Sequence, residues 1–241
     1  MTVLTALTPP PAFSFEGLRV QSAHGIEAWL VETPELPVIA LYFAFRDAGP
    51  VLMPSGPLVV QLPFPQSTCV FGHAGVRPAS PDYFPAIVLN HIVGGGTLTS
   101  RLFVELREKR GLVYSVRTTL EPLANESLMI GWFATENNKV PTAIELVRRA
   151  WRQLASGAVS ETDIDAAKAF LKGNLPLSLD GTSAMAGRLL AVQRLGLDMD
   201  HLTAWNAKVD AVTADMVRAL ARRLMRPDDL TFAIAGDPTD M

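Results

Sequence analysis

Few side chains in this sequence have the type and spacing to hold a metal ion. The four histidines are scattered, and only His24 has a glutamate three residues further on, Glu27. Ala28 then stands where a second histidine on one helical face would be needed. A glycine turn and a strand are expected here, so alternation would send Glu27 and Ala28 to opposite sides. A zinc site needs three converging protein ligands. We therefore expect no metal site, no catalytic residue and no cofactor in this chain.

Two polar side chains, Arg107 and Tyr114, stand at the ends of expected elements. Three glycines at 94–96 precede an expected helix, and Gly111 follows its basic last turn. The 3.6-residue period places four side chains on its buried face: Leu98, Leu102, Phe103 and Leu106. Arg107 lies at the border of that face. Residues 113–120 then alternate as a strand, with Tyr114, Val116 and Leu120 expected on one face. By residue type alone, Arg107 would form a surface ion pair and Tyr114 would pack in the core.

The ordered string from the glycines to the strand resembles a known family. It contains Ser-Arg-Leu at 100–102, Leu-Arg-Glu-Lys at 106–109 and Gly-Leu-Val-Tyr-Ser-Val at 111–116. This order is similar to the non-catalytic, C-terminal-type domain of the pitrilysin, insulinase and mitochondrial processing peptidase family of inverted-motif zinc peptidases. The resemblance covers about residues 57–238, and more loosely 15–49.

The resemblance implies a role for Arg107 and Tyr114 in binding substrate. In the family an arginine and a tyrosine seven residues apart occupy these positions. Two fixed donors can bind a peptide carbonyl and stabilise the negative charge that develops on it during hydrolysis. Neither side chain activates water, so the resemblance also implies a zinc ion supplied by another chain. The implied partners are a peptide or unfolded protein substrate and a zinc-bearing family subunit, with a homo-oligomer as the alternative.

The N-terminal segment resembles only the start of the family's catalytic half. Strand patterns at 18–20 and 26–31 flank a turn, and a nearly continuous apolar run follows at 38–45. The helix with H-x-x-E-H that follows in the family is missing, and the chain runs into a proline-rich stretch. We expect three parts: a remnant-like β meander segment at 1–49, a linker at 50–57 and a non-catalytic domain at 58–238.

The order of elements predicts an α+β fold, in which helices cover an antiparallel sheet after a short β meander. A strand at 62–72 precedes a helix ending near Gly94, and 113–120 pairs with 126–135 as a hairpin. Helical patterns then fill most of the chain: from Pro141 to Gly157, after a Ser160–Asp163 capping box, and at 182–195, 198–209 and 213–225. A last strand at 229–236 returns to the sheet.

Composition excludes several classes of function. The net charge of −3 offers no basic surface for nucleic acid, and no apolar run is long enough to span a bilayer. The single cysteine, Cys69, lies in an apolar run and is expected in the core. The glycine loop lacks the lysine and preceding strand of a phosphate-binding loop. Residues 1–11 do not resemble a secretory signal, so we expect a cytoplasmic location by default and leave the periplasm open.

Three functional hypotheses remain open. The first is a partner subunit that binds substrate through Arg107 and Tyr114 beside a zinc-bearing chain. The second is a catalytically dead scaffold for assembly, and the third is an internally deleted family member without activity of its own. The retained pair favours the first hypothesis over the second, whereas the abrupt junction at 49–57 favours the third.

Overall fold

The computed structural model describes residues 17–21, 27–31, 58–96, 98–123 and 126–239. Its main sheet has five strands: β3 (Leu58–Gln61), β4 (Gln66–Ala74), β5 (Val113–Pro122), β6 (Ser127–Glu136) and β7 (Thr231–Gly236). Their order is β3-β7-β4-β6-β5. All neighbours are antiparallel except β3 and β7, which are parallel. The predicted α+β fold is confirmed, including the hairpin and the returning last strand. The parallel edge strand β3 was not predicted.

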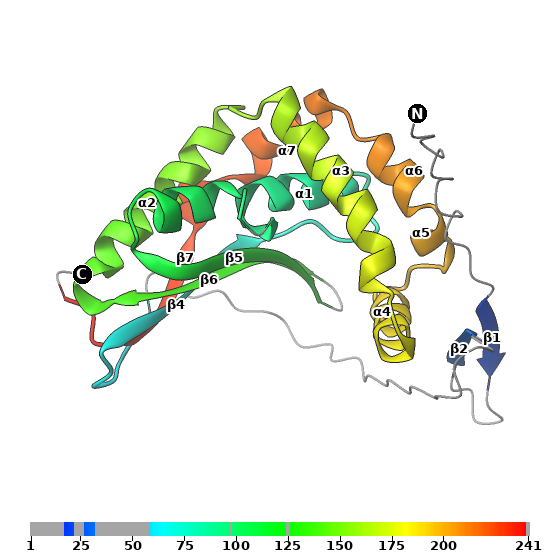
Figure 1. The fold of residues 1–241 in the computed structure, drawn as a ribbon, viewed down its shortest axis with the longest axis horizontal. Coiled ribbons are helices and arrows are strands. Elements are labelled where there is room, and N and C mark those ends of the chain that lie inside the picture. The colour runs from blue at the N-terminus through cyan, green and yellow to red at the C-terminus, as the bar shows by residue number, and fades with distance from the viewer. Residues whose placement is uncertain (1–16, 22–26, 32–57, 97, 124–125, 240–241) are drawn as a thin grey trace, which may run out of the picture.

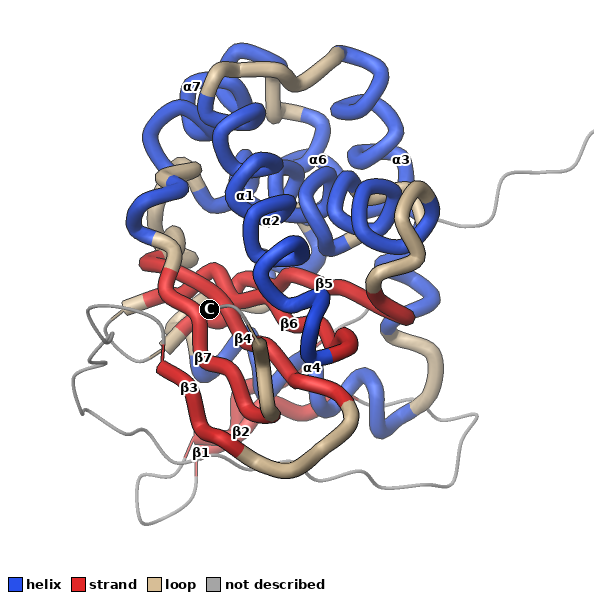
Figure 2. Tube along the Cα trace, turned by 90° about the vertical axis from the view of Figure 1, so that its left-hand side faces the viewer, coloured by secondary structure: helices blue, strands red, loops and turns tan. Residues whose placement is uncertain are grey.

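Most helices gather on one side of this sheet, whereas α4 lies beside the end of β5 and β6 (Figures 1 and 2). The helices are α1 (Tyr83–Asn90), α2 (Val140–Ala155), α3 (Glu161–Ser178), α4 (Thr182–Arg194), α5 (Asp200–Thr203), α6 (Trp205–Asp210) and α7 (Ala214–Leu224). Shorter helical turns complete the chain: η1 (His91–Gly95), η2 (Phe103–Glu108), η3 (Asn137–Lys139) and η4 (Pro227–Asp229). Among the described helices, none is long and apolar enough to cross a membrane.

The core lies between the sheet and α2. Phe71 of β4 packs against Phe133, Phe232 and Trp151, with ring centroids 5.7–6.0 Å apart. All four side chains are buried. Gly131 of β6 makes this packing feasible, because a Cβ there would lie 2.3 Å from the Phe71 ring. A side chain at 131 would therefore push Phe71 away from the sheet.

The opposite face of the sheet is largely uncovered by the described helices (Figure 1). Val70 and Trp132 are cross-strand neighbours on β4 and β6. Their side chains remain 43% and 41% exposed. An exposed tryptophan beside an exposed valine marks this face as one that another polypeptide could cover.

Local signals placed most helix ends correctly. Ser160 and Asp163 form the expected reciprocal capping box at the start of α3. Thr213 caps α7 by accepting a hydrogen bond from the Met216 N–H. Gly157 has a φ of +81°, which favours glycine, and follows the end of α2. The helical block therefore follows from capping residues and amphipathic periodicity together.

The N-terminal segment is described only as a hairpin. β1 (Gly17–Gln21) pairs antiparallel with β2 (Glu27–Val31), as the strand pattern predicted. The His24 turn, the apolar run at 38–45 and the linker at 50–57 lie outside the described residues. The three-part division of the chain therefore stays a prediction.

Candidate functional site

The end of η2 and the turn after it position Arg107. The fully buried Leu106 anchors η2 on the core, and Arg107 follows it at the exposed edge. The helix widens here, because the Lys109 N–H bonds to the Val104 carbonyl, five residues back, at 3.0 Å. Gly111, with a φ of +59°, then reverses the chain into β5. The glycine stop was predicted, but the buried position of Leu98 was wrong: Leu98 is exposed, and the helix begins only at Arg101.

A β-bulge positions Tyr114. Val113 pairs with Thr135 of β6 and Val116 pairs with Phe133, so Tyr114 and Ser115 together oppose one residue, Ala134. The simple alternation that placed Tyr114 on the same face as Val116 is therefore wrong, because Val116 is buried whereas Tyr114 is 86% exposed. The bulge redirects Tyr114 out of the core. Bulges of this kind are frequent beside functional sites.

The structure brings Arg107 and Tyr114 together. The Arg107 Cζ lies 5.8 Å from the centroid of the Tyr114 ring, within range of a cation–π contact. Nearby, Glu105 pairs with Lys109 at 2.5 Å and with Arg110 at 2.6 Å. The hydrogen bond from Lys109 lowers the pKa of Glu105, with Arg110 adding to the effect. Glu105 is thus engaged by these two cations. Within the described part of the chain, no ion pair involves the Arg107 guanidinium, so it presents hydrogen-bond donors to solvent.

The glycine loop before this turn owes its composition to close packing. A Cβ on Gly94 would lie 2.7 Å from Thr118 Oγ1 of β5, and one on Gly95 would lie 2.5 Å from Asn90 Nδ2. Gly94 therefore presses against β5 and Gly95 against Asn90 of α1, and a larger residue at either position would clash. This packing accounts for the glycines without a phosphate ligand.

The described histidines are occupied by core contacts. His73 Nε2 accepts a hydrogen bond from Trp151 Nε1 at 2.9 Å, and its Nδ1 lies 2.7 Å from the Ala74 carbonyl. His91 packs on Phe170, with centroids 4.6 Å apart, and His201 lies among aromatic rings. Burial lowers the pKa of all three histidines, that of His201 to about 4. No group of three or more His, Cys, Asp or Glu among the described residues could hold a metal ion. His24 lies outside them.

Cys69 is a buried core residue, as predicted. Its side chain has no exposed surface, and burial raises the pKa of its thiol to about 12. A thiol in this state is not a nucleophile near neutral pH.

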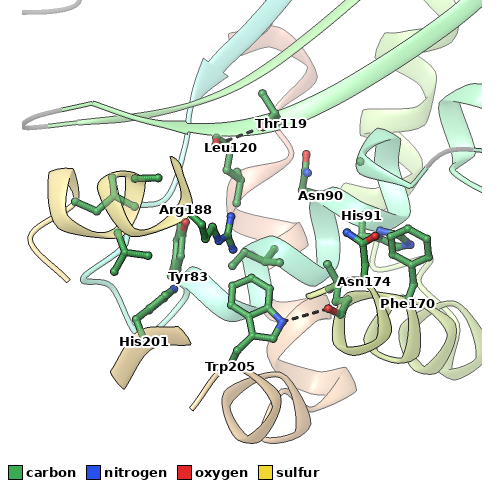
Figure 3. A pocket seen from close by; sticks show the side chains of 16 residues that line it. Tyr83, Asn90, His91, Thr119, Leu120, Phe170, Asn174, Arg188, His201 and Trp205 are labelled. Atoms are coloured by element: carbon green, nitrogen blue, oxygen red, sulfur yellow. Dashed lines mark hydrogen bonds between the residues drawn. The ribbon is translucent and has the colours of Figure 1, made fainter. Parts of the chain in front are cut away.

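A pocket that sequence reasoning missed lies between α1, α3, α4, α6 and the far part of β5 (Figure 3). It has a volume of about 260 Å³, and Tyr83, Arg188, His201 and Trp205 contribute to its wall. Arg188 comes from α4 and lies over the Trp205 ring of α6, with its Cζ 5.3 Å from the centroid. The one available signal was a lone charge: Arg188 is the only charged residue between positions 184 and 192.

Curated relatives match more than half of this chain. The chain is 29% identical to an uncharacterized zinc protease of Streptomyces coelicolor over 160 residues, which cover 66% of this chain and 35% of the relative. It is 30% identical to the mitochondrial-processing peptidase subunit beta of Saccharomyces cerevisiae over 210 residues, 78% of this chain and 45% of that protein. The chain thus spans between about a third and a half of the length of the curated relatives it matches.

Solved structures show the same fold. A peptidase M16 inactive domain from Pseudomonas fluorescens superposes with a TM-score of 0.69 at 24% identity, covering 81% of this chain and 47% of that one. A chain of complex III2 from Candida albicans superposes with a TM-score of 0.65 at 20% identity. The match covers 76% of this chain and 46% of the Candida albicans chain. At these identities the likeness establishes the fold alone.

The family model described as the peptidase M16 inactive domain matches residues 50–171, just over half of the chain. The resemblance to the non-catalytic domain is thereby confirmed. On this match, together with its zinc-protease and processing-peptidase relatives, the chain belongs to the family of peptidase M16 inactive domains.

Proposed function

We propose that this chain is a non-catalytic, substrate-binding subunit or domain of an M16-type zinc metallopeptidase. Arg107 and Tyr114 would donate hydrogen bonds to a backbone carbonyl of an extended peptide. The observation that carries the proposal is the contact between these two exposed side chains, in which the Arg107 Cζ lies 5.8 Å from the Tyr114 ring centroid. The buried Leu106 and the left-handed Gly111 fix the backbone between them.

The chemistry of the pair requires a second component. A guanidinium and a phenol can bind a carbonyl oxygen and stabilise charge on it, but neither supplies a hydroxide for hydrolysis. A zinc-bound water has a pKa near 7 and supplies that nucleophile. The described histidines are buried in aromatic contacts, so they do not suit this metal. The proposal therefore places the zinc in another family chain.

The uncovered face of the sheet supports the presence of that chain. Val70 and Trp132 expose apolar surface there, in a chain with few charged residues overall. Aromatic residues are enriched in protein interfaces, where their large surfaces are removed from water. The occupant we propose for this face is the zinc-bearing family chain. One matched relative is itself named as a subunit, and one matched structure is a chain of complex III2.

The proposed functional unit is the domain at 58–238. All five strands of the main sheet and all seven α-helices of the described structure fall within these bounds. The family model begins at residue 50, so the segment before it lies outside the match. In this proposal residues 1–49 are an appended segment, and 50–57 link it to the domain.

Affinity purification from the native cell tests the proposal. The tagged full chain should retain a second polypeptide with stoichiometric zinc, and that polypeptide should carry an H-x-x-E-H helix. Replacement of both Val70 and Trp132 by serine should reduce its recovery, whereas Arg149→Ser, an exposed position on α2, should not. Recovery of only further copies of this chain, without zinc, would instead support the scaffold or deletion hypothesis.

A further inference from the structure

The pocket between the helices and β5 has features of a ligand site distinct from the Arg107–Tyr114 pair. Its strand wall is formed by Thr119 and Leu120, five and six residues further along β5 than Tyr114. Its volume of about 260 Å³ lies just below the range of about 300–1,000 Å³ that holds drug-sized ligands. A ligand the size of one amino-acid residue would suit it.

Arg188 gives the pocket a positive charge without an acidic counterpart. None of the sixteen lining residues is an aspartate or a glutamate. The Arg188 Nε is buried and has no hydrogen-bond partner among the described residues. Burial lowers the pKa of Arg188, although a guanidinium stays charged near neutral pH. A desolvated charge without a counterion is unfavourable, so an anion bound here would relieve that cost.

Apolar side chains line one part of the pocket around this guanidinium, and Tyr83 lies beside it. The Trp205 ring lies beneath it, and Leu120 points toward it from β5 (Figure 3). Ile87 and Leu171 add aliphatic surface to the wall. A small inorganic anion would leave this apolar surface without a partner. The pocket therefore favours an anion that also carries an apolar group.

Asn90 offers a second polar contact. Its Nδ2 donates a hydrogen bond to the Thr118 carbonyl at 3.4 Å. Its Oδ1 is buried and accepts no hydrogen bond from the described residues. An amide oxygen of this kind is suited to an N–H donor. Carboxylate, apolar side chain and amide N–H occur together in an N-acylated amino acid and in the last residue of a peptide.

We propose that this pocket binds a small carboxylate with an apolar side chain, held by Arg188 through its carboxylate and against Trp205 through its side chain. Asn90 Oδ1 accepts the adjacent amide N–H. The ligand is either the carboxyl-terminal residue of a peptide or a free N-acylated amino acid. This pocket does not include Arg107 or Tyr114. Ligand binding in the pocket can therefore be tested separately from the proposed substrate binding.

Calorimetric titration of the full chain tests the site. The probes are N-acetylphenylalanine, the peptide Ala-Ala-Phe with a free carboxyl terminus, and the carboxamide of each. We expect the acids to bind at least about 10-fold more tightly than the amides, because a hydrogen bond to a charged group is worth more than a neutral one. Stronger binding of the tripeptide acid would identify a peptide terminus, and exclusion of the tripeptide would identify a free acid.

Two substitutions on the same helix provide the control. Arg188→Gln should weaken binding of the preferred acid about 10- to 100-fold. Arg194→Gln removes an exposed positive charge from α4 and should leave binding unchanged. Arg188→Met removes the charge but keeps an unbranched chain that can pack on the Trp205 ring, and a melting temperature equal to or above that of the wild type would show that the fold is intact. Equal binding of acids and amides, unchanged binding by Arg188→Gln, or no binding of either acid would overturn the proposal.

Discussion

Two arginine–aromatic pairs in this molecule have similar geometry and opposite surroundings. The Arg107 Cζ lies 5.8 Å from the Tyr114 ring centroid, and the Arg188 Cζ lies 5.3 Å from that of Trp205. Tyr114 is 86% exposed, whereas Trp205 is 6% exposed. The exposed guanidinium keeps its hydration and can be reached by a long polymer. The Arg188 guanidinium is half-buried with its Nε fully enclosed, so it has lost part of its water and can be reached only by a ligand that fits a small pocket.

The contrast shows that solvent, rather than the contact itself, decides what each pair can do. A charge at the surface interacts through a high dielectric, so its attraction for an anion is weak and sensitive to salt. Such a guanidinium can contribute to function by holding hydrogen-bond donors at a defined position. A charge under helices interacts more strongly, but only when a partner replaces the lost water. We therefore assign polymer binding to the first pair and recognition of a small anion to the second.

The largest expected difference between the two pairs is in stability. Trp205→Ala should lower the free energy of unfolding by about 3–5 kcal/mol, because it leaves a cavity among α1, α3 and α6. Tyr114→Ala should change it by no more than about 0.5 kcal/mol, as is usual for an exposed position. Urea unfolding followed by far-UV circular dichroism measures both values. Equal decreases in the free energy of unfolding for the two variants would contradict the burial of Trp205 and the exposure of Tyr114.

A smaller effect should follow from pH, and it arises in the pocket region. Desolvation by burial, with Lys208 and Arg188 nearby, lowers the pKa of His201 from 6.5 to about 4. Between these two values the unfolded chain binds a proton at this position that the folded chain does not. The free energy of unfolding is therefore not reduced by His201 above about pH 6.5, and it decreases as pH falls toward 4. From about pH 7.5 to about pH 5 the loss should be on the order of 1–2 kcal/mol.

His201→Gln isolates this contribution. The variant should lose less stability than the wild type across the same pH window, because one group that protonates on unfolding has been removed. His73 and His91 also have lowered pKa values, so some pH dependence should remain. An unchanged slope in the variant would mean that His201 takes up its proton equally in the folded and unfolded chain.

Features set by neighbouring residues could be predicted from the sequence. The capping box at Ser160 and Asp163, the glycine after α2 and the β5–β6 hairpin all depend on short-range chemistry, and the structure contains each of them. The family resemblance rested on one ordered string of residues, and the family model that matches residues 50–171 confirmed it. Arg107 and Tyr114 were singled out by that resemblance, and the short connection between η2 and β5 brings them together.

Features set by distant residues could not be predicted. Strand β3 has four exposed residues and no alternation, so only its pairing with β7 identifies it. The bulge at Tyr114 depends on the register with Ala134 of β6, which no local pattern records. In the pocket, Tyr83, Arg188 and Trp205 come from three helices spread over half the chain. Arg188 was visible as a lone charge, but its position in the wall of a pocket was not.

The central claim, that Arg107 and Tyr114 bind substrate beside a zinc-bearing chain, is tested most directly by peptide hydrolysis in the reconstituted complex. Arg107→Ala and Tyr114→Phe should each lower kcat/KM by ~10²-fold, the scale of losing one transition-state donor, without changing the free energy of unfolding. Arg149→Ala, which removes an exposed charge from α2, should have no effect. Full activity in both Arg107 and Tyr114 variants, or no activity with any zinc-bearing partner, would contradict the account.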